Sequence, residues 1–348
     1  ETKLSGIGLV AGLGLAALFF VGCGGRLGIP GRNERGLGPA VELAIRIGTI
    51  AIVVVAATYA FIHFPEWARG LKFQLTRHSH SDGVAYLNGE ISRDGWYHYF
   101  LIALPLKLSL GLLIAAVAGA LSLIGLVRQA SGARWLFLVL PPIVFFALAS
   151  YSRVNVGVRA VYPFVPFLYL LAGGLAAGAC CALARSAILA VCLGICVGSA
   201  QRASPYELSF FNELVRGPEN GAKHLADSNL DWGQGLPALK RWMDAHGVEM
   251  VYLGYFGTDR PESHGIRYQS LPGYGGLVPR GETIPANAPR HVLAVSVNNL
   301  LGLQLNDPET YSWLRDREPA AVVAGCIHVY DLTGDPAAIA RVRALPSR

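Results

Sequence analysis

Imidazoles, carboxylates and aromatic rings gather in one polar loop, residues 65–100. Its sequence is PEWARGLKFQLTRHSHSDGVAYLNGEISRDGWYHYF. His78, His80 and Asp82 alternate with a period of two, so an extended backbone would place all three side chains on one face. Imidazole nitrogens and a carboxylate on one face could bind a divalent metal. Contact with a neighbouring loop is the commoner outcome for such residues, and we predict no cofactor.

Cationic side chains stand beside apolar runs at several points in the chain. The connection SRVNVGVRAVYPFVPF, 152–167, places Arg153 and Arg159 at the ends of two apolar runs. Lys107 lies within the run ALPLKLSLGLL, and Lys3 stands near the start of the first apolar run. The guanidinium fork suits phosphate, and a cation inside a membrane segment indicates function. The alternative is that these residues anchor lipid headgroups or extend to the membrane surface.

The stretch PENGAKHLADSNLDWGQGL, 218–236, is polar and rich in turn residues. Asp227, Asn229 and Asp231 alternate within it, as ligands do in a calcium loop. A calcium loop also needs Gly at its sixth position and Glu at its twelfth, where this chain has Trp232 and Ala238. We therefore reject a calcium site and predict a turn whose Asp and Asn side chains accept local backbone N–H groups.

These groups must be positioned by a chain that is largely apolar. Of its 348 residues 53% are hydrophobic and only 15% are charged, where a soluble domain has about a quarter charged. The apolar runs predict a polytopic α-helical membrane protein with about six transmembrane helices, each needing about 20 residues. We place the spans at about 5–24, 47–64, 101–124, 136–151, 161–184 and 187–201, with a turn at Arg185-Ser186.

The net charge of +6 comes without any basic stretch interleaved with aromatics, so we predict no nucleic-acid partner. Five of the six cysteines lie in apolar runs and Cys326 stands alone in the polar tail, so we predict no disulfide framework.

Residues 202–348 predict a small α/β domain that follows the transmembrane region 1–201. The sequence Ser204-Pro205-Tyr206-Glu207 is typical of a capping box and predicts a helix over about 205–215. A second helix is expected over about 236–246, and Asp307-Pro308 and Asp335-Pro336 each look like a cap and first helical turn. Residues 249–256, 291–297 and 321–331 have the composition of strands, and their alternation with helices favours a mainly parallel sheet.

Three segments together resemble one enzyme family. They are GVAYLNGEISRDGWYHYFLIALPLK (83–107), NVGVRAVYPFVPFL (155–168) and ELSFFNELVRGPENGAKHLADSNLDWGQGLPALKRWM (207–243). They are similar to segments of bacterial glycosyltransferases that use a lipid carrier, in the protein-mannosyltransferase-like branch of the GT-C superfamily. The resemblance covers most of residues 1–245.

The resemblance implies a membrane enzyme that transfers a hexosyl or pentosyl group from a polyprenyl-phosphate donor. The acceptor would be a glycan, a lipid or a protein on the extracytoplasmic side of the cytoplasmic (inner) membrane. Loops 65–100 and 152–160 and the tail would face outward. Phosphate contacts would fall to Arg159, Arg153, Lys107 and Lys3, because the leaving phosphate develops charge that cations stabilise. Asp82, Glu90, His78 and His80 would line the sugar or acceptor site, and Trp232 would pack at the junction or stack on sugar.

The family's general base lies in an early outward loop, and TKLSG at residues 2–6 resembles a mid-chain stretch of such enzymes. By that alignment the chain corresponds to a C-terminal portion, so we name no catalytic residue in it and expect this portion alone to be inactive.

Two other functions fit membrane-embedded charges. A transporter or flippase for a lipid-linked or anionic substrate is one, but such proteins show internally repeated groups of spans, and we find none. A membrane-anchored binding or sensor module is the other, with its ligand pocket in 202–348. Against it, an anchor needs only one span, whereas the sequence predicts about six.

Overall fold

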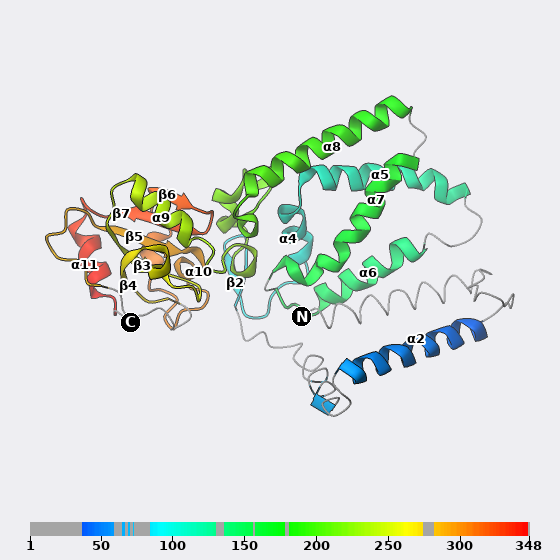
Figure 1. The fold of residues 1–348 in the computed structure, drawn as a ribbon, viewed down its shortest axis with the longest axis horizontal. Coiled ribbons are helices and arrows are strands. Elements are labelled where there is room, and N and C mark those ends of the chain that lie inside the picture. The colour runs from blue at the N-terminus through cyan, green and yellow to red at the C-terminus, as the bar shows by residue number, and fades with distance from the viewer. Residues whose placement is uncertain are drawn as a thin grey trace.

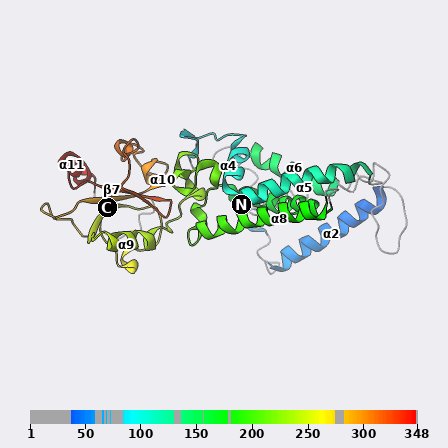
Figure 2. The same ribbon diagram turned by 90° about the horizontal axis from the view of Figure 1, so that it is seen from above.

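Helices form one end of the molecule and a β-sheet forms the other (Figure 1). The structure, a computed structural model, describes residues 37–58, 65–66, 69, 72, 84–129, 136–155, 157–177, 181–273 and 282–346. Seen from above, the two ends again lie side by side along the longest axis (Figure 2). The segment between α8 and α9 therefore joins two different architectures.

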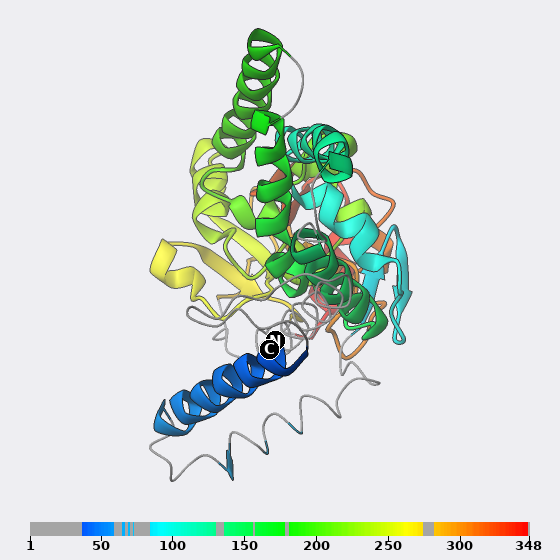
Figure 3. The ribbon, with the colours of Figure 1, turned by 90° about the vertical axis from the view of Figure 1, so that its right-hand side faces the viewer.

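The helical end is built from apolar helices whose backbone groups are paired within each helix. They are α4 (Tyr99–Lys107), α5 (Leu110–Gln129), α6 (Leu136–Tyr151), the 3-10 helix η1 (Val158–Phe164), α7 (Val165–Ala177) and α8 (Ala182–Ala203). α5 packs against both α7 and α8. A further helix, α2 (Leu37–Thr58), lies apart from these helices in two views (Figures 1 and 3).

The prediction of about six membrane spans is wrong for the part of the chain that the structure describes. Two helices there, Val158–Ala176 and Ala182–Ala203, are long and apolar enough to cross a membrane. A third span results only if α4 and α5 count together as one broken span. The finding is consistent with a protein that associates with a membrane.

The apolar runs differ from spans for identifiable reasons. The run at 101–124 is divided at Leu108, where the backbone is extended and α4 and α5 meet with a bend of 112°. α6 has only 16 residues, fewer than the roughly 20 that a span needs. The helix expected from about residue 47 begins at Leu37, and the turn expected at Arg185-Ser186 lies inside α8. The run at 5–24 lies outside the described residues.

A short hairpin precedes the helical end. Strands β1 (Ala85–Leu87) and β2 (Glu90–Ser92) pair antiparallel, and Asn88-Gly89 between them has positive φ at both residues. Asn-Gly adopts this two-residue turn readily, because both residues tolerate the left-handed region. The Asn88 N–H donates to the His224 carbonyl oxygen at 2.9 Å, which docks the hairpin on the polar stretch 218–236.

The tail contains a five-stranded mixed sheet with the order β4-β3-β5-β7-β6. The strands are β3 (Met250–Gly254), β4 (Arg267–Ser270), β5 (Val292–Ser296), β6 (Ala321–Val323) and β7 (Ile327–Asp331). The α-helices are α9 (Leu236–Ala245), α10 (Val297–Leu300) and α11 (Pro336–Ala344). β3 pairs in parallel with β4 and β5, and β7 pairs antiparallel with β5 and β6. Every residue of the central strand β5 is buried, as its apolar run Val292–Val295 requires, and the buried Ser296 hydroxyl accepts the Phe256 N–H.

Parts of the tail confirm the sequence-based predictions and parts correct them. α9 and β3 lie where they were expected, and Asp335 caps α11 by accepting the Ala338 N–H at 2.9 Å. The sheet is mixed instead of mainly parallel, because 321–331 forms a hairpin whose turn, Ala324-Gly325, has positive φ. Among the described residues no α-helix begins at Asp307-Pro308; a turn there is followed by the 3-10 helix η7 (Ser312–Leu314). Strand β4 was not predicted.

The helix predicted over 205–215 is also absent. α8 continues to Ala203, and Ser204 then adopts an extended backbone, the conformation that a following proline favours. The segment continues as short 3-10 turns: η2 (Glu207–Ser209), η3 (Glu213–Val215), η4 (Pro218–Lys223) and η5 (Asp227–Asn229). Asn212, not Ser204, caps a turn here, accepting the Leu214 N–H at 3.0 Å.

A single apolar core connects the two ends of the molecule. Its buried side chains include Tyr99 and Phe100 of α4, Leu230 of the junction, and Val251 and Ile327 of the sheet. The helical end and the sheet are therefore held by shared packing as well as by the chain that joins them.

Close packing of α5 on α7 gives a first prediction. A Cβ added at Gly174 would lie 2.6 Å from Leu123 Cγ and 2.8 Å from the Gly119 carbonyl oxygen, whereas Gly173 has no atom within 4 Å. Gly174→Leu should lower stability by about 1–3 kcal/mol, because the two helices must separate to admit the side chain. Thermal unfolding of the purified protein in detergent measures the effect. Gly173→Leu is the control, and equal losses in both variants would contradict this helix contact.

Candidate functional site

The buried amide of Asn229 holds the junction between the helical end and the sheet. Its Oδ1 accepts the Val158 N–H at 2.9 Å, and its Nδ2 donates to the Tyr99 hydroxyl oxygen at 2.7 Å. One side chain of the polar stretch thus fixes both the start of η1 and the start of α4. The side chain has no exposed surface, so each of these bonds replaces one that water cannot supply.

Lys107 lies at the end of α4 and donates to three backbone carbonyl oxygens. They are those of Leu208 at 2.8 Å, Phe210 at 2.6 Å and Asn229 at 2.6 Å. The Phe211 ring lies over the ammonium, 4.4 Å from Nζ to the ring centroid. An ammonium has three donors. All of them are used here to fasten segment 208–229 onto the helices, which leaves none for the phosphate contact predicted from the sequence.

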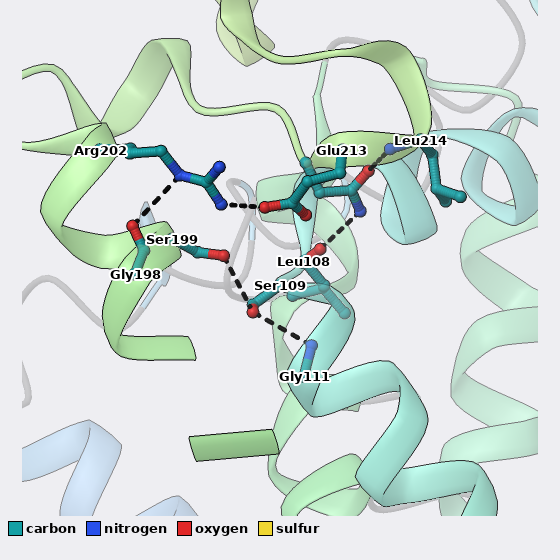
Figure 4. A network of polar contacts seen from close by, with 9 residues as sticks. Leu108, Ser109, Gly111, Gly198, Ser199, Arg202, Glu213 and Leu214 are labelled. Carbon is teal, nitrogen blue, oxygen red and sulfur yellow. Dashed lines mark hydrogen bonds and ion pairs between the residues drawn. The ribbon is translucent and has the colours of Figure 1, made fainter. Parts of the chain in front are cut away.

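A second set of hydrogen bonds, made by Asn212, spans the break between α4 and α5 (Figure 4). Asn212 Nδ2 donates to the carbonyl oxygens of Pro105 at 2.5 Å and Leu108 at 2.7 Å. Both carbonyls lie at the end of α4, where intrahelical partners run out. The Ser109 hydroxyl also donates a hydrogen bond to the Ser199 hydroxyl oxygen of α8 at 3.3 Å. The break is therefore a defined structural feature with its own polar partners.

Arg159 and Trp232 come together across the junction. The Arg159 guanidinium carbon lies 5.7 Å from the centroid of the Trp232 ring. Trp232 is 51% exposed and its ring is tilted against Phe256, with 6.1 Å between the ring centroids. Arg159 is also exposed. A cation over a half-exposed indole presents both a charge and an aromatic surface to solvent.

Arg153 makes a similar contact at the other end of the same connection. Its guanidinium carbon lies 5.0 Å from the centroid of the Tyr97 ring, which stacks on Tyr151 at 6.2 Å. Both tyrosines are exposed. Arg153 has φ of 52°, a left-handed backbone that is unusual for residues other than glycine. The connection from Arg153 to Arg159 thus carries two guanidinium groups, each on an aromatic ring.

The carboxyl of Asp231 is fully buried beside this surface. Its Oδ1 accepts the Gly233 N–H at 2.8 Å. Burial raises the pKa of Asp231 to about 7, and bonds from Gly233, Ser296 and Cys326 oppose that increase. The Cys326 thiol is buried as well, and burial with the nearby Asp231 raises its pKa. Both groups are inaccessible to a ligand, so their effect is on stability.

The other residues predicted for the site divide into two groups. Glu90 is described and exposed, in β2 of the short hairpin. Lys3, His78, His80 and Asp82 lie outside the described residues. Within the ranges that the structure describes, no three His, Cys, Asp or Glu side chains are placed to hold a metal ion.

Two polar residues of the junction, Asn155 and Asn229, are not among the predicted site residues. Asn155 Oδ1 accepts the Trp96 N–H at 2.5 Å, and Asn229 joins Val158 to Tyr99 as described above. Asn229 lies 71 residues from one of these partners and 130 from the other. No local pattern reveals such pairs, although the alternation DSNLD marks the segment that supplies Asn229.

In comparisons with protein families, curated proteins and solved structures, nothing matches this chain.

The three hydrogen bonds of Lys107 give a second prediction. Lys107→Met keeps the length of the side chain but leaves three carbonyl oxygens without their donor, so it should lower stability by about 3 kcal/mol. Lys223→Met is the matched control: Lys223 is exposed, and within the described part of the chain its side chain bonds only to Asn220. Its loss should stay within about 0.5 kcal/mol. Thermal unfolding compares the two, and similar losses would contradict a structural role for Lys107.

Asp231 gives a third prediction, for the pH dependence of stability. Its pKa in the folded protein, about 7, lies above the ordinary value of 3.8, so the folded state binds more protons between these values. Asp231 therefore lowers stability as the pH rises from about 4 to about 7. The full effect is on the order of 4 kcal/mol, since one pKa unit corresponds to about 1.4 kcal/mol.

Asp231→Asn should remove that loss, because the amide stays neutral while its oxygen can still accept the Gly233 N–H. Burial lowers the pKa of His328 to about 4, which makes stability rise with pH over part of the same range. The informative quantity is therefore the difference in unfolding temperature between variant and wild type. That difference should increase from pH 4 to pH 7.5, and a constant difference would show that Asp231 does not titrate there.

Proposed function

We propose that the chain carries the donor-binding part of an integral-membrane glycosyltransferase. The enzyme would transfer a hexosyl or pentosyl group from a polyprenyl-phosphate carrier to a lipid, protein or glycan acceptor. The site would lie at the extracytoplasmic face of the cytoplasmic membrane, with the sheet domain on the same side. The similarity of segments 83–107, 155–168 and 207–243 to such enzymes motivates the substrate class and the orientation.

The observation that carries the proposal is the contact of Arg159 with Trp232. A guanidinium group can grip a phosphate with two parallel hydrogen bonds. An exposed indole offers a flat apolar face on which a sugar ring can lie. The two groups are in contact here. A glycosyl phosphate presents its phosphate and its sugar on either side of one bond, so it can contact both groups at once. Arg153 on Tyr97 extends the cationic and aromatic surface along the same connection.

The position of this surface suits a lipid-borne ligand. Arg159 lies in the first turn of Val158–Ala176, a helix long and apolar enough to cross a membrane, so it stands at one end of that helix. A carrier whose chain lies among lipid tails would present its phosphate at such an end.

The chemistry assigned to these residues is binding and charge stabilisation. When the bond between the anomeric carbon and the phosphate oxygen breaks, the phosphate gains negative charge, which Arg159 and Arg153 would stabilise. A general base must deprotonate the acceptor. We assign no such base among the described residues.

The decisive experiment, and the fourth prediction, uses the intact gene product in membranes with a radiolabelled polyprenyl-phosphate sugar. Arg159→Ala should reduce transfer about tenfold or more, because a charge-assisted hydrogen bond contributes about 1.5–3 kcal/mol. Arg159→Lys should retain part of the activity, since it keeps the charge and loses the fork. Trp232→Ala should raise the KM for the donor.

Arg260→Ala is the control, because Arg260 is an exposed arginine of the sheet domain far along the chain from the connection. Undiminished transfer in Arg159→Ala would remove the assigned role of Arg159. If wild type moves the labelled lipid between leaflets without any glycosyl transfer, the protein is a flippase and the proposal fails.

A further inference from the structure

A cavity opens on the junction, and neither Arg159 nor Trp232 lines it. Its volume is about 570 Å³, within the range of small-molecule sites. It is lined by the segment that follows α8, including Phe210 and Arg216, and by the β6–β7 hairpin, including Val322. The cavity is therefore a separate site from the contact of Arg159 with Trp232.

The cavity begins where a candidate membrane helix ends. Arg202, in the last turn of α8, lines it and donates to Glu213 of η3, as Figure 4 shows. Farther back along α8, Leu193 and Val197 are exposed, and they offer an apolar surface that leads toward the cavity. A ligand seated here would therefore have its polar part at the membrane boundary and apolar helix surface beside it.

The charges that line the cavity balance each other. Arg202 and Glu213 form an ion pair, which leaves one guanidinium and one carboxylate, those of Arg216 and Glu219. Both are exposed, and among the described residues neither side chain has an ion pair or a hydrogen bond. Arg216 has φ of 62°, a backbone conformation in which a long side chain is uncommon. Backbone strain of this kind is often found at functional sites.

A ligand complementary to these two groups carries one negative and one positive charge. An anion alone would satisfy Arg216 but would be repelled by Glu219, and a cation alone would meet the reverse problem. Phosphate suits the guanidinium fork, and a primary ammonium can donate hydrogen bonds to a carboxylate. Phe210 and Val322 supply apolar walls for the part of the ligand between its head and its chains.

We propose that this cavity binds the headgroup of a zwitterionic phospholipid of the phosphoethanolamine type, with its phosphate on Arg216 and its ammonium on Glu219. The acyl chains lie along the exposed apolar surface of α8. The site ties the junction to the surface of the membrane and is independent of the proposed glycosyl transfer.

The test, and the fifth prediction, measures binding to the intact protein in detergent. Short-chain phosphatidylethanolamine, phosphatidylglycerol and inorganic phosphate are titrated separately, and affinities are read by native mass spectrometry. Phosphatidylethanolamine should bind about tenfold tighter than phosphatidylglycerol, since only the former supplies a cation for Glu219. Arg216→Glu should weaken phosphatidylethanolamine binding about tenfold or more. Glu219→Lys should reverse the preference in favour of phosphatidylglycerol.

Two controls separate the cavity from general surface charge. Arg260→Glu and Glu249→Lys make the same changes at exposed positions that do not line the cavity, and they should leave the lipid preference unchanged. Circular dichroism verifies that each variant is folded. Equal binding of the two lipids to wild type would overturn the proposal, as would full competition by inorganic phosphate at similar concentration, which would indicate a free-anion site. Unchanged binding in both cavity variants would also overturn it.

Discussion

The buried polar groups at the junction must find partners inside the protein, and the rest of the structure depends on how they do so. α4 ends at Lys107 with carbonyl groups that α5 cannot satisfy, because the chain bends by 112° between them. Asn212 supplies donors to two of these carbonyls, while Lys107 turns back to three carbonyls of the tail. An unpaired group here would cost about 1–3 kcal/mol, so these bonds fix the tail on the helices.

The same bonds place the candidate sites. Asn229 ties η1 to the polar stretch, and that brings Arg159 beside Trp232. The bonds of Asn212 over the α4–α5 break hold the segment that lines the cavity with Arg216 and Glu219. A rigid polar junction therefore presents two surfaces, one cationic and aromatic, the other of balanced charge. A change within the junction should affect both, whereas a change at either surface should stay local.

The sequence by itself determined the elements whose signals are local. The apolar runs predicted helices in the first part of the chain, the strand-like runs predicted β3 and β5, and Asp335-Pro336 predicted the cap of α11. Periodicity and capping act within one or two turns, so the sequence contains them directly. The same reasoning singled out Arg153 and Arg159, because charged residues beside apolar runs are unusual. Trp232 was named only through the resemblance of segment 207–243 to the glycosyltransferase family.

Only the tertiary structure decided which of those elements are long enough to be candidate membrane spans, and which side chains contact each other across the chain. A break at Leu108 and the shortness of α6 depend on packing that the apolar composition does not reveal. The hairpin of β6 and β7 changed the sheet from parallel to mixed through one left-handed turn. Lys107 looked like a ligand for phosphate, yet it holds carbonyl groups about a hundred residues away. A side chain's partner is set by the path of the whole backbone, and no local pattern carries that information.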